Sequence, residues 1–211
     1  MPSFNVAILG AECTGKSSLA TALVARLQTS NTPALHIPEY LREWCDLHHR
    51  TPQIHEQAHI AAVQSQRLAA ATLQAVEGSI VIADTTPLMT AVYSDLYFND
   101  SSLYPFALQQ HRAYALTLLT GLDIAWVADG IQRDSESIRK AADLRLREVL
   151  GQHQIPFTTI YGLGTARTDS ALQAIAYQTA GPRTGPQSDW KWTCDKCSDA
   201  DCEHRMFSRL L

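Results

Sequence analysis

The stretch Gly10-Ala11-Glu12-Cys13-Thr14-Gly15-Lys16-Ser17 limits the possible folds of this chain more than any other. It fits the pattern G-x-x-x-x-G-K-[ST], in which the backbone N–H groups of a turn and of the following helix bind phosphate oxygens. The flanks agree, because residues 4–9 are predicted to form a short buried strand and residues 18–27 a helix with regularly spaced leucines. A chance match in an ordinary strand-turn-helix is the alternative. With every defining residue and both flanks present, the sequence predicts a site for a nucleoside triphosphate.

Each residue type in this phosphate-binding loop (P-loop) has an expected role. Lys16 can reach the outer phosphates, and the Ser17 hydroxyl can hold Mg²⁺. Backbone N–H groups of residues 13–18 are expected to surround the phosphates. The predicted contacts with the nucleotide are Gly10, Cys13, Thr14, Gly15, Lys16, Ser17 and Ser18.

Composition excludes several other classes of protein. The 211 residues suit one α/β domain with a small appendage, and the formal net charge of -4 without a Lys/Arg block argues against a nucleic-acid partner. No run approaches the ~20 apolar residues needed to span a bilayer, so no membrane insertion is expected. The first residues lead into a strand without a secretory signal pattern. The five cysteines, an odd number, do not form a disulfide framework, which favours the reducing cytoplasm.

A second group of candidate residues follows the next predicted strand, residues 34–38. Here the chain continues as Glu39-Tyr40-Leu41-Arg42-Glu43. Ligands of open parallel sheets bind beyond the carboxyl ends of the strands, so these residues are predicted to contact a substrate. The alternative is a solvated helix start in which Glu39 and Arg42 form an ion pair with i, i+3 spacing.

Residues 52–77 are predicted to form a long helix because their apolar residues recur with helical spacing. His55 and His59 lie four residues apart on it, a spacing that can hold a metal ion. Because the H-E-x-x-H arrangement is absent, exposed helix histidines are the preferred interpretation.

Asp84 ends the short apolar run Ile80-Val81-Ile82-Ala83, which is typical of the strand that presents a carboxylate beside the phosphates and Mg²⁺. Asp84 would hold the metal ion through water or accept a proton from a substrate hydroxyl. Alternatively, it caps a helix that begins near Pro87. Tyr93, Tyr97 and Phe98 follow with nearly helical spacing and are expected either in the core or in the wall of an acceptor pocket.

The remaining predicted elements are a short helix at 103–113, a strand at 115–119, a helix at about 135–150, a strand at 157–161 and a helix at 166–179. Before the helix at 135–150, an Asp129-Gly130 turn leads to Arg133. This arrangement suits a mobile flap whose arginine moves onto the transferring phosphates and excludes water.

Several of these segments, taken in order, resemble the ribosylnicotinamide kinase domain of NadR-type proteins and related AAA-like ATPases of bacteria. The segments are the P-loop, Glu39-Tyr40-x-Arg42-Glu43, Asp84-Thr85, residues 114–119 and Trp126-Val127-Ala128-Asp129-Gly130-x-x-Arg133. The resemblance covers residues 4–180. Ala115 stands where the family often has Asp, and Pro38 stands where some members have an aromatic residue.

The resemblance implies ATP-dependent phosphorylation of the 5′-hydroxyl of nicotinamide riboside to nicotinamide mononucleotide. Lys16, Asp84, Glu39 and Arg133 are the expected catalytic residues. Glu39, Tyr40, Arg42, Asp84 and Asp129 are the expected contacts with the acceptor, and Trp44, Tyr93 or Tyr97 would stack on its ring. Ser17 and Asp84 are the expected Mg²⁺ ligands. A nucleotide-controlled switch protein, and a kinase for another nucleoside or vitamin-like alcohol, are the alternatives.

The tail after residue 180 carries Cys194, Cys197, Cys202 and His204 within eleven positions. Three thiolates and one imidazole form an ordinary tetrahedral Zn²⁺ set, and a metal ion could supply folding energy where no apolar core is possible. Free thiols or a redox-active Cys-x-x-Cys are the alternatives. The sequence thus predicts a P-loop NTPase-type α/β sandwich with a mostly parallel sheet at 1–180, followed by a linker and Cys/His-rich tail at 181–211.

Overall fold

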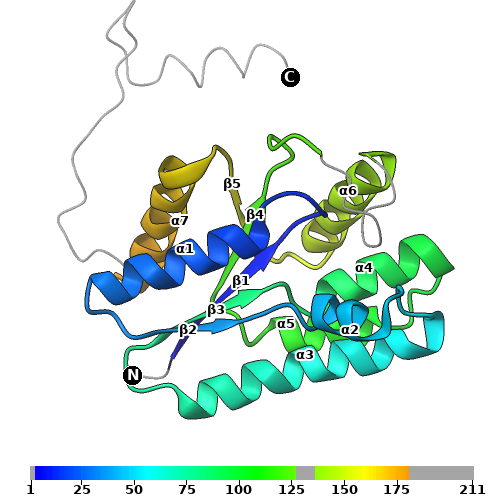
Figure 1. The fold of residues 1–211 in the computed structure, drawn as a ribbon, viewed down its shortest axis with the longest axis horizontal. Coiled ribbons are helices and arrows are strands. Elements are labelled where there is room, and N and C mark those ends of the chain that lie inside the picture. The colour runs from blue at the N-terminus through cyan, green and yellow to red at the C-terminus, as the bar shows by residue number, and fades with distance from the viewer. Residues whose placement is uncertain (1–2, 127–135, 181–211) are drawn as a thin grey trace, which may run out of the picture. The chain divides into compact units, whose positions relative to one another are not determined.

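The computed structural model describes residues 3–126 and 136–180. In this part of the chain, five parallel strands form one sheet in the order β2-β3-β1-β4-β5 (Figure 1). The strands are β1 (Phe4–Leu9), β2 (Ala34–Ile37), β3 (Ile80–Asp84), β4 (Leu116–Thr120) and β5 (Thr158–Ile160). The helices are α1 (Lys16–Thr29), α2 (Tyr40–His48), α3 (Ile54–Gln74), α4 (Pro87–Phe98), α5 (Tyr104–His111), α6 (Glu136–Gln152) and α7 (Gly164–Thr179).

Helices cover both faces of the sheet because alternate strand side chains point to opposite sides. Val6 and Ile8 belong to a buried cluster formed with α1 and α7. Leu9 and Leu119 face the other way, into a cluster with α4, α5 and α6. Val81 packs with α3 on that second side. The predicted three-layer α/β sandwich is therefore confirmed, and Figure 1 shows α1 and α7 on one side of the strands.

The strand order gathers the predicted site residues at one edge of the sheet. β1 lies between β3 and β4, and Ile8 pairs in register with Asp84. Ile37 at the end of β2 pairs with Ala83. The P-loop, Asp84 and Glu39 thus all emerge at the carboxyl edge, where ligands bind in open α/β sheets.

The helix boundaries correct one sequence interpretation. The cap of α4 is Thr86, whose hydroxyl oxygen accepts a hydrogen bond from the Leu88 N–H at 3.2 Å. The alternative role of Asp84 as that cap is therefore wrong. The long predicted helix is α3, which begins with a reciprocal capping box between Gln53 and Glu56.

The residues up to Thr179 form one compact unit. The predicted tail at 181–211 lies outside the described residues, so the division into a kinase domain and a Cys/His-rich tail stays a prediction. Within the described ranges, no helix is long and apolar enough to cross a membrane.

Candidate active site

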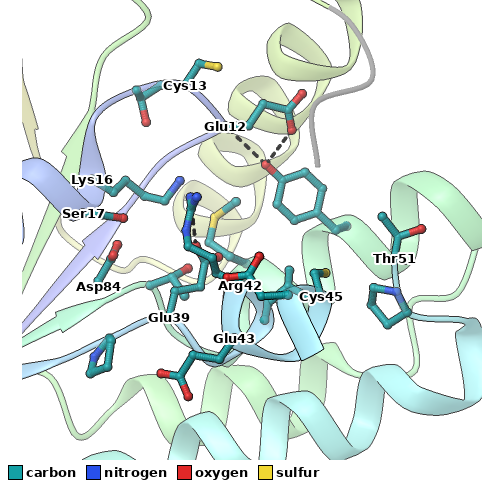
Figure 2. Close-up of a pocket in the computed structure, with 18 of the residues that line it drawn as sticks. Glu12, Cys13, Lys16, Ser17, Glu39, Arg42, Glu43, Cys45, Thr51 and Asp84 are labelled. Atoms are coloured by element: carbon teal, nitrogen blue, oxygen red, sulfur yellow. Dashed lines mark hydrogen bonds and ion pairs between the residues drawn. The ribbon is translucent and has the colours of Figure 1, made fainter. Parts of the chain in front are cut away.

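A cavity of about 690 Å³ lies over the carboxyl edge of the sheet. Residues 12–18 of the P-loop form one wall, and Glu39, Arg42 and Asp84 also line it (Figure 2). Segments that are far apart in the sequence thus share one space. Of the predicted nucleotide contacts, only Gly10 lies outside the lining.

The P-loop is held in shape by side chains below it. Gly10 has a φ of 148°, and a Cβ atom there would collide with the Thr120 hydroxyl. That hydroxyl donates a hydrogen bond to Thr14 Oγ1 at 2.7 Å, and Thr14 Oγ1 donates to the Ala11 carbonyl at 2.7 Å. The Thr14 side chain therefore stabilises the loop, which leaves phosphate binding to its backbone.

Lys16 and Ser17 at the start of α1 face the cavity. The Lys16 ammonium donates a hydrogen bond to the Ala11 carbonyl oxygen at 2.9 Å, so it lies over the loop. Asp84 is 2% exposed, and among the described residues its Oδ1 has no hydrogen-bond partner. Hydroxyl and carboxylate oxygens are the ligands that Mg²⁺ prefers. Ser17 and Asp84 therefore fit the Mg²⁺ role.

Glu39 is the second carboxylate of the cavity, and its side chain is 14% exposed. Burial raises the pKa of Glu39, as does the nearby Asp84, while Lys16 and Arg42 oppose the shift. Arg42 lies 3.8 Å from the carboxylate. The ion pair expected for a solvated helix start is therefore present, and both of its members also line the cavity.

A buried glutamine fixes the backbone on either side of Glu39. Gln64 of α3 accepts a hydrogen bond from the Tyr40 N–H at 2.8 Å and donates one to the Pro38 carbonyl at 3.4 Å. The Tyr40 N–H is one of the donors that a helix start leaves without an intrahelical partner. Gln64 satisfies this donor, and the Glu39 side chain makes no capping hydrogen bond.

Tyr40 and Trp44 lie behind the cavity wall instead of in it. The Arg67 guanidinium lies 4.7 Å from the centre of the Tyr40 ring and forms two hydrogen bonds of 2.6 Å with Glu43. Trp44 is buried and stacks on His48, with ring centres 4.0 Å apart. Neither aromatic ring contributes to the cavity lining.

The aromatic side chains that do line the cavity come from α4, namely Tyr93, Tyr97 and Phe98. The Tyr93 hydroxyl accepts a hydrogen bond from the Glu12 N–H at 3.1 Å and donates one to Glu12 Oε2 at 3.2 Å. Burial raises the pKa of Tyr93 well above its usual value, so the phenol keeps its proton. Glu12 is a site residue that the sequence does not mark, because the P-loop motif allows any residue at its position.

Arg167 on α7 is a second residue of the site that the sequence does not mark, and its side chain holds the P-loop backbone at Thr14. Its guanidinium donates to the Thr14 carbonyl at 2.7 Å and to the Gly162 carbonyl at 2.9 Å. Arg167 is 4% exposed, and burial lowers its pKa although the Asp123 carboxylate, 3.7 Å away, opposes the shift. No sequence signal marks it, since it lies in an ordinary helical pattern.

Several predicted site residues lie outside the described residues. These are Asp129, Arg133 and the four candidate zinc ligands Cys194, Cys197, Cys202 and His204. His55 and His59 are both exposed on α3. Among the described residues, no group of three or more His, Cys, Asp or Glu side chains could hold a metal ion.

Comparison with known proteins agrees with this architecture. A model of the AAA domain matches residues 5–167. The chain belongs to the AAA domain family. No curated protein sequence matches this AAA domain protein.

Solved structures of NadR have the same fold. NadR in complex with NR has a TM-score of 0.69 and 19% sequence identity, over 87% of this chain and 54% of the NadR chain. NadR in complex with NAD and AMP-PNP has a TM-score of 0.65 and 19% identity, over 87% of this chain and 51% of the NadR chain. The AAA domain chain thus spans about half the length of these NadR chains. The resemblance to the P-loop domain of NadR is confirmed for the fold.

Proposed function

We propose that this protein is an ATP-dependent kinase that phosphorylates the 5′-hydroxyl of nicotinamide riboside, which gives nicotinamide mononucleotide and ADP. The observation that carries the proposal is the shared cavity. Lys16 and Ser17 of the P-loop line it together with two carboxylates, Glu39 and Asp84, from two other segments.

Phosphoryl transfer needs positioning and charge stabilisation more than covalent chemistry by the protein. Lys16 would exchange its bond with the Ala11 carbonyl for one to a phosphate oxygen. Ser17 and Asp84 would hold Mg²⁺, which neutralises phosphate charge when bound. Glu39 would accept the proton of the acceptor hydroxyl while the oxygen of that hydroxyl bonds to the γ-phosphorus. The bond between the γ-phosphorus and the oxygen that bridges it to the β-phosphorus then breaks, which releases ADP.

The pKa of Glu39 suits a general base. A base works best when its pKa approaches the operating pH, and burial moves the pKa of Glu39 in that direction. Arg42, which lies beside it, would orient the acceptor. The resemblance of residues 126–133 to the kinase domain would make Arg133 the residue that stabilises charge on the transferring group and Asp129 a contact with the acceptor.

The extent of the cavity favours a kinase over a nucleotide switch, because a switch protein needs no space for a second molecule. Here the lining continues from the P-loop past Tyr93, Tyr97 and Phe98 to Thr51 and Pro52. The aromatic side chains of α4 would contact the ring of the acceptor. The structurally similar NadR in complex with NR supports nicotinamide riboside as the first acceptor to test.

The decisive experiment measures ADP release by the full-length protein with Mg·ATP, with and without nicotinamide riboside. Rapid ADP formation that depends on the riboside, with nicotinamide mononucleotide as the product, is the expected result. Hydrolysis that does not respond to the riboside would favour the switch protein. A panel of other nucleosides and vitamin-like alcohols would identify a different acceptor.

A further inference from the structure

Two buried glutamines of α3 have unequal hydrogen bonding. Gln57 and Gln64 lie seven residues apart, so they occupy the same face of the helix. They are 5% and 2% exposed. The Gln64 amide oxygen accepts a hydrogen bond from the Tyr40 N–H, and its nitrogen donates one to the Pro38 carbonyl. The Gln57 amide donates one long hydrogen bond of 3.4 Å, to the Pro52 carbonyl.

The incompletely used amide is the one that lines the cavity. Gln57 belongs to the lining, whereas Gln64 does not. Among the described residues, the Gln57 carbonyl oxygen accepts no hydrogen bond. This oxygen is not one of the fully buried polar atoms without a partner, so it is accessible from the cavity. A side-chain amide has two acceptor sites and two donors, and these are costly to leave unsatisfied once a ligand excludes water from them. The Gln57 amide is therefore available to a ligand in the cavity, which can complete its hydrogen bonding.

Gln57 lies at the end of the cavity away from the phosphates. Its one hydrogen bond joins it to Pro52, next to Thr51. Figure 2 shows Thr51 on the opposite side of the cavity from Ser17 and Asp84. The reacting hydroxyl of an acceptor must lie near Asp84 and Glu39, so the non-reacting end of the same molecule extends toward Gln57.

We propose that Gln57 is a specificity-determining residue that binds an amide edge at the non-reacting end of the acceptor. An amide offers a donor and an acceptor side by side, which complements the amide of Gln57 with two hydrogen bonds. A primary carboxamide on a pyridine ring and the lactam of a nucleobase both have this edge. The inference builds on the proposed function, since it names the part of the acceptor that the same cavity recognises.

The selectivity follows from what a wrong acceptor leaves unpaired. A carboxylate in place of the carboxamide has no donor for the Gln57 oxygen. A site built around a hydrogen bond rejects analogues that lack it, because its buried polar group then stays unsatisfied.

The test compares wild type, Gln57→Met and the control Gln66→Met, which changes an exposed glutamine of the same helix. The full-length proteins are assayed with Mg·ATP and two acceptors, nicotinamide riboside and nicotinic acid riboside. For Gln57→Met, kcat/KM for the carboxamide acceptor is expected to fall about tenfold or more. Its kcat/KM for the carboxylate acceptor stays within about twofold, and Gln66→Met matches wild type with both.

The shift in Tm caused by nicotinamide riboside without ATP supplies a readout that does not need catalysis. A larger shift in wild type than in Gln57→Met supports the inference even if turnover is absent, in which case only the proposed function fails. Equal losses for both acceptors, an unchanged ratio between them, or equal Tm shifts in the two proteins would overturn the role of Gln57. A wild type that neither phosphorylates nor binds the riboside is then tested with guanosine and inosine, whose bases have a lactam, and equal Tm shifts for wild type and Gln57→Met overturn the role of Gln57 as well.

Discussion

The two walls of the cavity are built in different ways. The P-loop wall is one continuous stretch whose polar groups bond to each other and to supports, such as Thr120 and Arg167. The acceptor wall combines the end of β2, the end of β3 and parts of α2, α3 and α4. Its carboxylates are less satisfied, since burial raises the pKa of Glu39 and Asp84 Oδ1 has no partner among the described residues.

This difference indicates a preformed nucleotide side and an acceptor side completed by its ligand. Phosphate binding needs rigid N–H donors, and a loop held by internal hydrogen bonds supplies them at no further ordering cost. Buried carboxylates without full hydrogen bonding are costly to a folded protein, so they are expected where a substrate or ion supplies the missing partners. Changes on the P-loop wall should therefore impair the handling of ATP, and changes on the acceptor wall should separate activity from stability.

The largest effect is expected for Lys16→Ala. Lys16 is the cation of the P-loop, and losing one preorganised charge that stabilises a transition state costs about 100-fold to 1,000-fold in kcat. The Tm should change little, because Lys16 makes one hydrogen bond to the Ala11 carbonyl. ADP release and thermal unfolding measure the two quantities, and substantial remaining kinase activity would contradict the role of the P-loop.

Glu39→Gln should reduce kcat by about 100-fold, as for the loss of a general base. In wild type, kcat/KM should rise as the pH rises through the pKa of Glu39, which lies above the ordinary value of 4.5. The variant should lack this acidic limb. A pH–rate profile of both proteins tests the assignment, and an unchanged limb in the variant would contradict Glu39 as the general base.

The same substitution should leave the fold equally stable or more stable at neutral pH. A raised pKa means that folding holds the Glu39 proton more tightly, so its contribution is present below pH 4.5 and is lost as the pH rises through the folded pKa. The ionised carboxylate therefore opposes folding at neutral pH, and glutamine removes that penalty. Glu43→Gln is the contrasting control, because hydrogen bonds from Arg67 lower the pKa of Glu43 and that variant should lose stability.

The contrast between the walls also explains what the sequence could predict. The P-loop is encoded in consecutive residues, and the buried strands have continuous apolar runs. The fold class and the position of Lys16 at the start of α1 could therefore be predicted from the sequence. Asp84 and Glu39 could be predicted because the ends of parallel strands meet at one edge.

The supports of the site could not be predicted from local patterns. Glu12, Gln64 and Arg167 act through contacts with residues 24 to 153 positions away in the chain. Tyr40 shows the converse, since its motif suggested substrate contact and the structure places its ring under Arg67. Local spacing does not determine which side of a helix start faces a cavity.

Arg167→Met tests whether the P-loop wall is preformed. The substitution leaves the carbonyl oxygens of Thr14 and Gly162 without their charged donors, so the free energy of unfolding should fall by about 2–3 kcal/mol. A less rigid loop should also raise KM for ATP about tenfold, with a smaller effect on KM for the acceptor. Arg26→Met is the matched control, because Arg26 pairs with Asp169 at 3.0 Å where both side chains are about half exposed. It should cost less than about 1 kcal/mol.

The smallest effect is expected for Tyr93→Phe, which removes the two hydrogen bonds between the Tyr93 hydroxyl of α4 and Glu12. The phenylalanine ring keeps the packing against Tyr97. The Glu12 N–H and the Glu12 carboxylate each lose a hydrogen bond to the uncharged hydroxyl, so the free energy of unfolding should fall by about 1 kcal/mol. If the P-loop wall is independently preformed, KM for ATP should stay within about twofold of wild type. A rise in KM for ATP as large as that of Arg167→Met would show instead that the acceptor wall helps to hold the P-loop, and the two walls would then act as one unit.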